Sequence, residues 1–209
     1  KNFIPTSAIV SSAVPEAVGY AYALKYKKQR GVVICYHGDG ATEEGVFWES
    51  LNFSSLHNLP IIFICENNEY AIYTHQNRRS LNDPIVNRAN AFGVNAIKVK
   101  ENNTENYYNI TLEHIDKIKK NPGPCLIECM TTRWKDHVGV GNAYNLRYRN
   151  TEEIEKAIEN DDLNNLQKQL PEKKVEEIKN LVFKKIDNAV NFAETSEFPY
   201  SKELYDNVY

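Results

Sequence analysis

Short apolar runs alternate with longer segments of helical character along the first 130 residues. The clearest runs are residues 31–36, 61–65 and 125–130, and Gly or Pro residues stand beside each of them. Apolar runs of this length between turn signals predict buried strands. Residues 96–100 alternate apolar and charged positions, which predicts a fourth and more exposed strand.

The segments between these runs predict helices. A helix is expected from Val14–Pro15 to about Lys27, because Pro suits the first helical turn. Thr42 is expected to cap the next helix, which stops before Pro60. Further helices are expected near residues 83–92 and 104–120, and a charged helical stretch covers residues 151–194.

Strands that alternate with helices of ten or more residues predict an α/β fold with a parallel sheet and helices on both faces. We therefore expect a three-layer α/β domain over residues 1–150 and a helical extension over residues 151–209, which packs on the same domain or on a partner. Parallel sheets of this type bind ligands at the carboxyl ends of their strands.

Composition and charge exclude several classes of function. The chain has 209 residues, 42% of them hydrophobic, and a formal net charge of −3, which argues against a nucleic-acid or anionic membrane surface. No stretch approaches the length of a membrane span and no signal peptide is visible. Cys35, Cys65, Cys125 and Cys129 lie in apolar runs, so we expect buried reduced thiols in a cytoplasmic protein.

The candidate chemistry follows two neighbouring strands of the predicted sheet. Gly38-Asp39-Gly40 ends the first, and Asn67-Asn68 ends the second after 26 intervening residues. Asp39, the side chain of Asn68 and the carbonyl of Tyr70 are oxygen ligands of the kind that Mg²⁺ prefers. The backbone amides of Gly40 and Ala41 would face a diphosphate. The alternative is that Asp39-Gly40 is only a turn.

The residues around both motifs resemble a known family. Residues 38–52 and 59–72 are similar to the alpha subunit of 2-oxo acid dehydrogenases, the thiamin diphosphate-dependent first components that act on pyruvate, branched-chain 2-oxo acids or acetoin. The resemblance extends over nearly the whole chain. The full alpha subunit is longer, so the resemblance implies that roughly the first third is missing here.

The resemblance implies roles for individual residues. Asp39, Asn68 and the Tyr70 carbonyl would bind magnesium, and Gly40 and Ala41 would contact the diphosphate. Ile72 matches the apolar residue that supports the V-shaped cofactor, and Val10 matches a residue of the pyrimidine pocket. His137 matches a histidine of the loop that closes over the cofactor, near the diphosphate and the substrate entrance, which implies a cofactor-binding and catalytic residue; the alternative is a surface histidine without a role.

The resemblance also implies partners. In the family, the glutamate that activates the cofactor comes from the beta subunit, so this chain would be inactive alone. The usual assembly has two alpha and two beta subunits, which implies self-association of alpha, and a lipoyl acyltransferase takes the acyl group. The identity of the small 2-oxo acid substrate is not implied.

Other functions stay open. A transketolase-like or decarboxylase enzyme shares the Asp39 and Asn68 pattern, and a degenerate, non-catalytic subunit would keep the fold. A dinucleotide-binding domain ranks last, because no Gly-x-Gly-x-x-Gly follows the first strand.

Overall fold

The computed structural model describes residues 3–4, 7–80, 84–100, 103–139, 141 and 148–206. The chain divides into two compact units, residues 1–162 and 163–209. The first unit contains the sheet and both predicted motifs.

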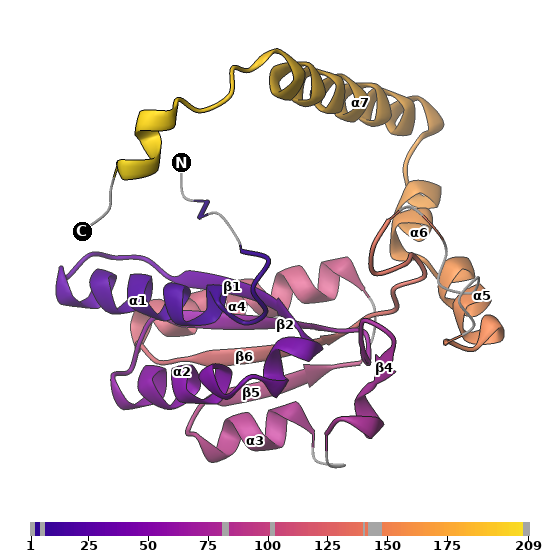
Figure 1. The fold of residues 1–209 in the computed structure, drawn as a ribbon. Coiled ribbons are helices and arrows are strands. Elements are labelled where there is room, and N and C mark those ends of the chain that lie inside the picture. The colour runs from indigo at the N-terminus through magenta and orange to yellow at the C-terminus, as the bar shows by residue number, and fades with distance from the viewer. Residues whose placement is uncertain are drawn as a thin grey trace. The chain divides into compact units, whose positions relative to one another are not determined.

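A parallel sheet forms the centre of the first unit (Figure 1). Its strands lie in the order β1 (Val33–Gly38), β2 (Ile61–Asn67), β6 (Cys125–Met130) and β5 (Asn95–Val99). All three pairings are parallel. The four predicted strands are therefore confirmed, although β1 begins two residues later than predicted and extends to Gly38.

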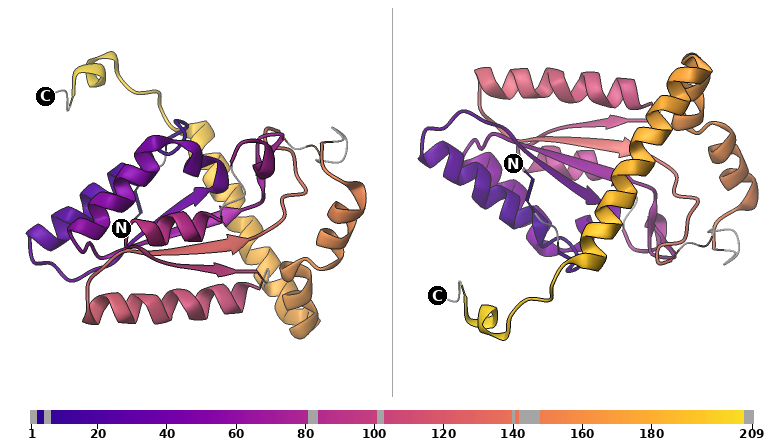
Figure 2. Two further views of the ribbon diagram at one scale, coloured as in Figure 1. Left: turned by 90° about the horizontal axis from the view of Figure 1, so that it is seen from below. Right: turned by 90° about the horizontal axis from the view of Figure 1, so that it is seen from above.

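Helices cover both faces of the sheet (Figure 2). The helices of one face are α1 (Ala13–Tyr26), α2 (Gly45–Leu56) and α3 (Ile85–Ala91), and α4 (Thr104–Lys120) covers the other. Successive residues of β2 serve opposite faces, since Ile61 and Phe63 pack in one core cluster and Ile62 and Ile64 in the other. The predicted three-layer α/β fold is confirmed.

The connection after β1 differs from the prediction. A short 3₁₀ helix, η1 (Asp39–Glu43), follows the strand, and α2 begins only at Gly45 with Glu44 as its N-cap. The prediction that Thr42 caps this helix was wrong, because the buried Thr42 hydroxyl donates to the Asp39 carbonyl at 2.8 Å within η1.

A small hairpin that the sequence did not predict follows β2. It consists of β3 (Tyr70–Ala71) and β4 (Thr74–His75), and η2 (Gln76–Arg78) comes directly after it. Two-residue strands have too little periodicity to be recognised from sequence.

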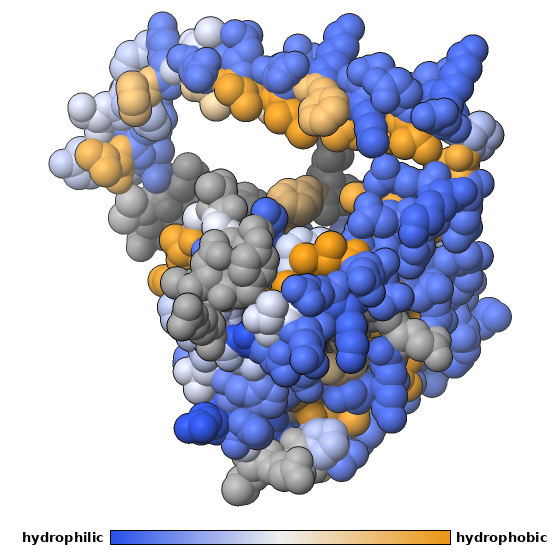
Figure 3. All heavy atoms as spheres, turned by 90° about the vertical axis from the view of Figure 1, so that its right-hand side faces the viewer, coloured by the Kyte–Doolittle hydropathy of each residue, from blue (hydrophilic) through white to orange (hydrophobic). Residues whose placement is uncertain are grey.

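The second unit is helical. It contains most of α6 (Asp162–Gln169), then α7 (Glu172–Thr195) and η4 (Ser201–Tyr205). Exposed apolar side chains gather along α7 (Figure 3), among them Ile178, Leu181, Val182, Phe183, Ile186 and Val190. Helix α5 (Thr151–Glu159), which the sequence analysis assigned to the C-terminal extension, lies in the first unit, where Ile154 is buried.

The four cysteines are buried and free. Burial raises the pKa of Cys35 and of Cys129 to about 11 and that of Cys125 to about 12. These thiols are packing residues, as predicted. Among the described residues, no helix has the length and apolar character needed to cross a membrane.

His37 is a buried polar residue at the end of β1. Its Nδ1 donates to the Gly38 carbonyl at 3.1 Å, and its ring lies 4.8 Å from that of Phe47. Its Nε2 is buried without a partner. Burial lowers the pKa of His37 to about 4, so the folded chain keeps this imidazole neutral where the unfolded chain protonates it.

We therefore predict that His37 makes the stability of the fold depend on pH. His37 of the unfolded chain binds a proton below its pKa of about 6.5, whereas His37 of the folded chain binds one only below about pH 4. Protonation therefore favours the unfolded chain between these two values. Between pH 7.5 and pH 5 this effect removes about 2 kcal/mol of stability. His37→Asn, which keeps a donor for Gly38, should reduce the pH dependence of urea unfolding by that amount. An unchanged dependence in this variant would contradict the prediction.

Candidate functional site

The carboxyl ends of β1 and β2 bring the two predicted motifs side by side. Gly38 is paired with Glu66 in the parallel register of these strands. Asp39 follows directly after β1, and Asn68 follows directly after β2. The prediction that the two strands are neighbours is thus confirmed, and both motifs lie at the same edge of the sheet.

Asp39 is a buried carboxylate with a basic partner. Only 1% of the residue is exposed, although it begins the short helix η1. Its Oδ2 forms an ion pair with the Nη2 of Arg79, a residue that follows η2. The sequence analysis did not identify Arg79, because no local pattern relates residues that lie 40 positions apart.

Gly40 and Ala41 occupy the first turn of η1, where the chain passes close to the hairpin. A Cβ atom on Gly40 would lie 3.1 Å from the Cβ of Ala71 in β3. This spacing is tighter than most real contacts, so a larger residue at position 40 would push η1 away from the hairpin. Ala41 is buried as well.

Asn67 and Asn68 have different surroundings. Asn67 is fully buried, and its Nδ2 donates to Glu128 Oε1 at 2.7 Å while its Oδ1 accepts from the Glu69 amide at 2.8 Å. Glu128, in β6, also pairs with Lys98 at 3.0 Å. Asn67 therefore ties the loop to the sheet through Glu128, whereas Asn68 remains partly exposed.

The Asn68 side chain turns the loop toward the hairpin. Its Oδ1 accepts from the Tyr70 amide at 3.0 Å, and Glu69 between them has a positive φ of 67°. An amide oxygen has a second lone pair, so this bond leaves Asn68 able to accept a further contact.

Arg149 holds this loop from a distant part of the chain. Its Nη2 donates to the Asn68 carbonyl at 2.6 Å, and its guanidinium lies 4.2 Å from the centre of the Tyr70 ring. Its Nη1 pairs with Glu153 at 2.9 Å. Arg149 is 4% exposed, so the loop that carries Asn68 and Tyr70 is fixed by a desolvated cation.

Ile72 has a strained backbone. Its φ is 54°, in the left-handed region that a β-branched residue rarely adopts, and about half of its side chain is exposed. Its carbonyl accepts from Arg133 Nη2 at 3.0 Å. Strain of this kind costs about 1–3 kcal/mol and gathers at functional sites.

Arg133 links Ile72 to His137. Its Nη1 donates to His137 Nδ1 at 2.8 Å, and its Nη2 also lies 3.3 Å from the Tyr148 hydroxyl. An arginine has only donors, so Nδ1 of His137 accepts, and a neutral His137 carries its proton on Nε2. His137 itself is exposed.

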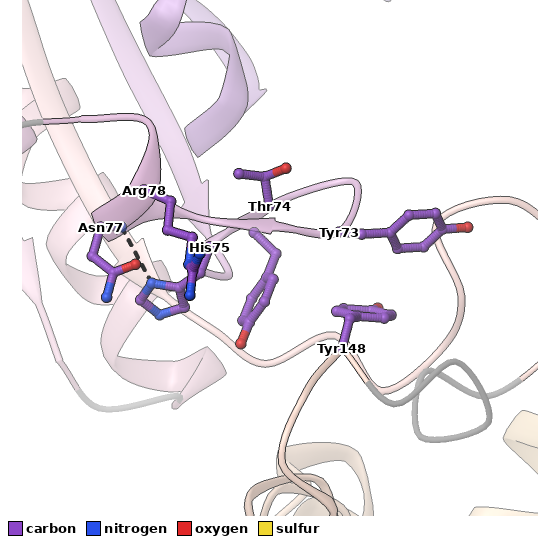
Figure 4. Close-up of a pocket in the computed structure, with 7 residues that line it drawn as sticks. Tyr73, Thr74, His75, Asn77, Arg78 and Tyr148 are labelled. Atoms are coloured by element: carbon purple, nitrogen blue, oxygen red, sulfur yellow. Dashed lines mark hydrogen bonds between the residues drawn. The ribbon is translucent and has the colours of Figure 1, made fainter.

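A polar pocket of about 480 Å³ opens beside the hairpin (Figure 4). The rings of Tyr73 and Tyr148 lie 5.0 Å apart, and His75 Nδ1 accepts from the Asn77 amide at 3.2 Å. The same wall includes Tyr70, so the pocket adjoins the loop of Asn68.

Val10 lies apart from these contacts, in the segment before α1, and 58% of it is exposed. Its expected place at a pyrimidine ring stays a prediction, as do the roles of the other site residues. The described residues contain no group of three or more His, Cys, Asp or Glu side chains that could hold a metal. The ligands that the sequence analysis expected are of a different kind: one carboxylate, one side-chain amide and one backbone carbonyl, all of them oxygen donors of the type that Mg²⁺ prefers.

Comparison with known proteins relates the chain to one family. The family model of the dehydrogenase E1 component matches residues 1–202. The alpha subunit of acetoin:2,6-dichlorophenolindophenol oxidoreductase from Bacillus subtilis (strain 168) is 34% identical, over 100% of this chain and 63% of its own length. The alpha subunit of the pyruvate dehydrogenase E1 component from Zymomonas mobilis is 32% identical, over 99% of this chain and 59% of its own.

The chain thus spans about three fifths of these relatives, 63% and 59% of their lengths. Among solved structures, transketolase from Campylobacter jejuni superimposes with a TM-score of 0.53 and 25% identity, over 61% of this chain and 20% of the transketolase chain. The likeness supports the α/β fold described above.

We predict that Ile72→Gly has little effect on stability, because relief of the backbone strain offsets the lost contacts of a half-exposed side chain. The free energy of unfolding should change by less than about 1 kcal/mol. Ile97→Gly is the matched control, since Ile97 is a partly buried residue of β5 without a positive φ. The control should lose about 2 kcal/mol or more, and an equal loss in both variants would contradict the prediction.

Proposed function

The chain belongs to the dehydrogenase E1 component family, and from this premise we propose that it binds Mg²⁺ and the diphosphate of thiamin diphosphate as an alpha subunit. The whole enzyme would carry out oxidative decarboxylation of a 2-oxo acid and transfer the acyl group to lipoamide. The observation that carries the proposal is the buried Asp39 carboxylate at the end of β1, beside the Asn68 loop at the end of β2.

Three oxygen donors would hold the cation. Asp39 offers a carboxylate, Asn68 its amide oxygen and Tyr70 its backbone carbonyl, and Mg²⁺ takes such ligands together with phosphate oxygens. The hydrogen bond from the Tyr70 amide to Asn68 Oδ1, 3.0 Å long, supports the proposal. It keeps the Asn68 amide oxygen and the Tyr70 carbonyl, the two proposed ligands of this loop, within one turn of the chain. Gly40 and Ala41 would lie next to the diphosphate.

Ile72 and Val10 would contact the organic part of the cofactor. The strained Ile72 backbone, held by Arg133, supports a role in shaping the bound cofactor, since strain of this kind persists where function requires the conformation. When bound, thiamin diphosphate supplies the electron sink for decarboxylation. The acidic residues of this chain include none that we assign to cofactor activation, so a beta subunit would supply that glutamate.

His137 would act as the catalytic histidine of this chain. The Arg133 contact at Nδ1 directs the proton of a neutral His137 to Nε2, so this atom can donate to an anionic group or transfer a proton. Ionised Arg133 would also hold the ring in place.

The remaining parts of the proposal concern the assembly. We propose a beta partner that completes the site, self-association of alpha and a lipoyl acyltransferase that accepts the acyl group. The relatives from Bacillus subtilis and Zymomonas mobilis are themselves named as alpha subunits, which supports this arrangement. Four buried free thiols suit a reducing compartment, and we place the protein in the cytoplasm.

A second candidate is a transketolase-like or decarboxylase reaction, favoured by the structural likeness to a transketolase. A third is a degenerate subunit that binds only partners. Acyl transfer to lipoamide separates the first candidate from ketol transfer between sugars, and cofactor binding separates both from the third.

We predict that Asp39→Asn abolishes magnesium-dependent binding of thiamin diphosphate, because the variant removes the charge of the proposed ligand. Calorimetric titration of thiamin diphosphate into the chain, with Mg²⁺ and with a chelator, measures the effect. Glu44→Gln is the control, since Glu44 is exposed five residues away and the change in net charge is equal. Full binding by Asp39→Asn, or no binding by the wild-type chain when a beta subunit is also present, would contradict the proposal.

We also predict that His137→Asn lowers the rate of CO₂ release from the 2-oxo acid by about 100-fold in the complete enzyme, more than it weakens cofactor binding. His137→Gln should retain more activity, because its amide nitrogen lies near the position of Nε2. His57→Gln, at the end of α2, serves as the control. Equal activity of both His137 variants and the wild type would refute the role of His137.

A further inference from the structure

Arg79 makes three polar contacts beside the proposed cation site. Its Nη2 pairs with Asp39 Oδ2, its Nη1 with Glu43 Oε1 at 2.9 Å, and its Nε donates to the Thr74 carbonyl at 3.3 Å. The side chain is 12% exposed, whereas that of Asp39 is 2% exposed. Arg79, which follows the hairpin and η2, thus places a largely buried guanidinium against the Asp39 carboxylate.

The pairing has a clear physical cause. A buried carboxylate without a counter-charge is strongly unfavourable, and removal of one partner from a buried ion pair is costly. Arginine suits this position because its guanidinium stays charged and its donors can reach two carboxylates at once. Arg79 therefore neutralises Asp39 within the chain itself.

The same carboxylate is the proposed ligand of Mg²⁺. A cation bound to Asp39 would approach the guanidinium, and two cations near one buried carboxylate repel each other. Mg²⁺ also requires near-octahedral geometry, which leaves no place for a guanidinium in its shell. Arg79 and the divalent cation are thus alternatives at Asp39.

We propose that Arg79 is an internal counter-ion of Asp39 that a divalent cation must displace. The inference rests on the proposed function, because it needs Asp39 to bind the cation. Once displaced, Arg79 keeps Glu43 as a partner, and Glu43 is more exposed than Asp39, at 29% against 2%. The competition weakens binding of the cation alone.

The competition also couples the cation to the diphosphate. A diphosphate that binds with the cation adds negative charge next to the displaced guanidinium, so the charges of the full complex balance better than those of the cation alone. Each ligand therefore strengthens binding of the other, as linkage requires.

The test measures binding of Mn²⁺ alone to the 209-residue chain, by the loss of the electron paramagnetic resonance signal of the free ion. Arg79→Gln should lower the dissociation constant about tenfold, or about 1.4 kcal/mol. The matched control is Arg78→Gln, because Arg78 is the exposed neighbour, loses the same charge and makes no ion pair with Asp39 among the described contacts. Arg78→Gln should bind as the wild type does, and Asp39→Asn should bind no Mn²⁺.

Circular dichroism verifies that each variant is folded. If Arg79→Gln fails to fold, Arg79→Met replaces it, because methionine fills a similar space without the charge, and the dissociation constant of Mn²⁺ for that variant should still fall. Mn²⁺ binding that is equal or weaker in the Arg79 variant, but lost in Asp39→Asn, overturns this inference and leaves the proposed function intact. Absence of Mn²⁺ binding in the wild type and in the Arg79 variant, with thiamin diphosphate as well as without it, overturns both.

Discussion

The contacts of the site depend on the burial of one carboxylate, that of Asp39. Asp39 leaves β1 at the edge of the sheet, and it enters a short helix where 1% of it remains exposed. A charge in such a place needs a partner of opposite sign. Arg79, which comes directly after η2, supplies that partner, so the ion pair connects the segment that follows the hairpin β3–β4 to the end of β1.

Around this pair, basic side chains hold the loops, together with ring contacts of Tyr148 with Tyr70 and Tyr73. Arg149 fixes the carbonyl of Asn68, and Arg133 joins the carbonyl of Ile72 to His137. The backbone carbonyls of loops lie outside the sheet ladder, so they need hydrogen-bond donors from side chains or water. The sheet, in contrast, is held by apolar packing, because the two core clusters bury both faces of β2 and β6. An apolar scaffold therefore supports a site whose loops are held by charged and polar contacts.

The strained backbone of Ile72 lies in the loops of the site and not in the apolar sheet. Its positive φ is found in the hairpin turn and not in the sheet, and a guanidinium donates to its carbonyl. The free energy stored there is small beside that of the core, yet it is placed where an expected cofactor would make contact. In the second unit, α7 carries exposed apolar side chains.

The sequence by itself determined the layers, the parallel strands and the two motifs at their ends. Local periodicity and turn residues carry that information, because helix and strand patterns repeat within about ten residues. The family also followed from contiguous residues, 38–52 and 59–72. The tertiary structure alone decided that Thr42 belongs to a 3₁₀ helix, that Asn67 braces the core while Asn68 faces the site, and which arginines reach the loops. The physical reason is distance along the chain: Arg79 contacts a residue 40 positions away and Arg149 one 81 positions away, and no local pattern encodes such pairings.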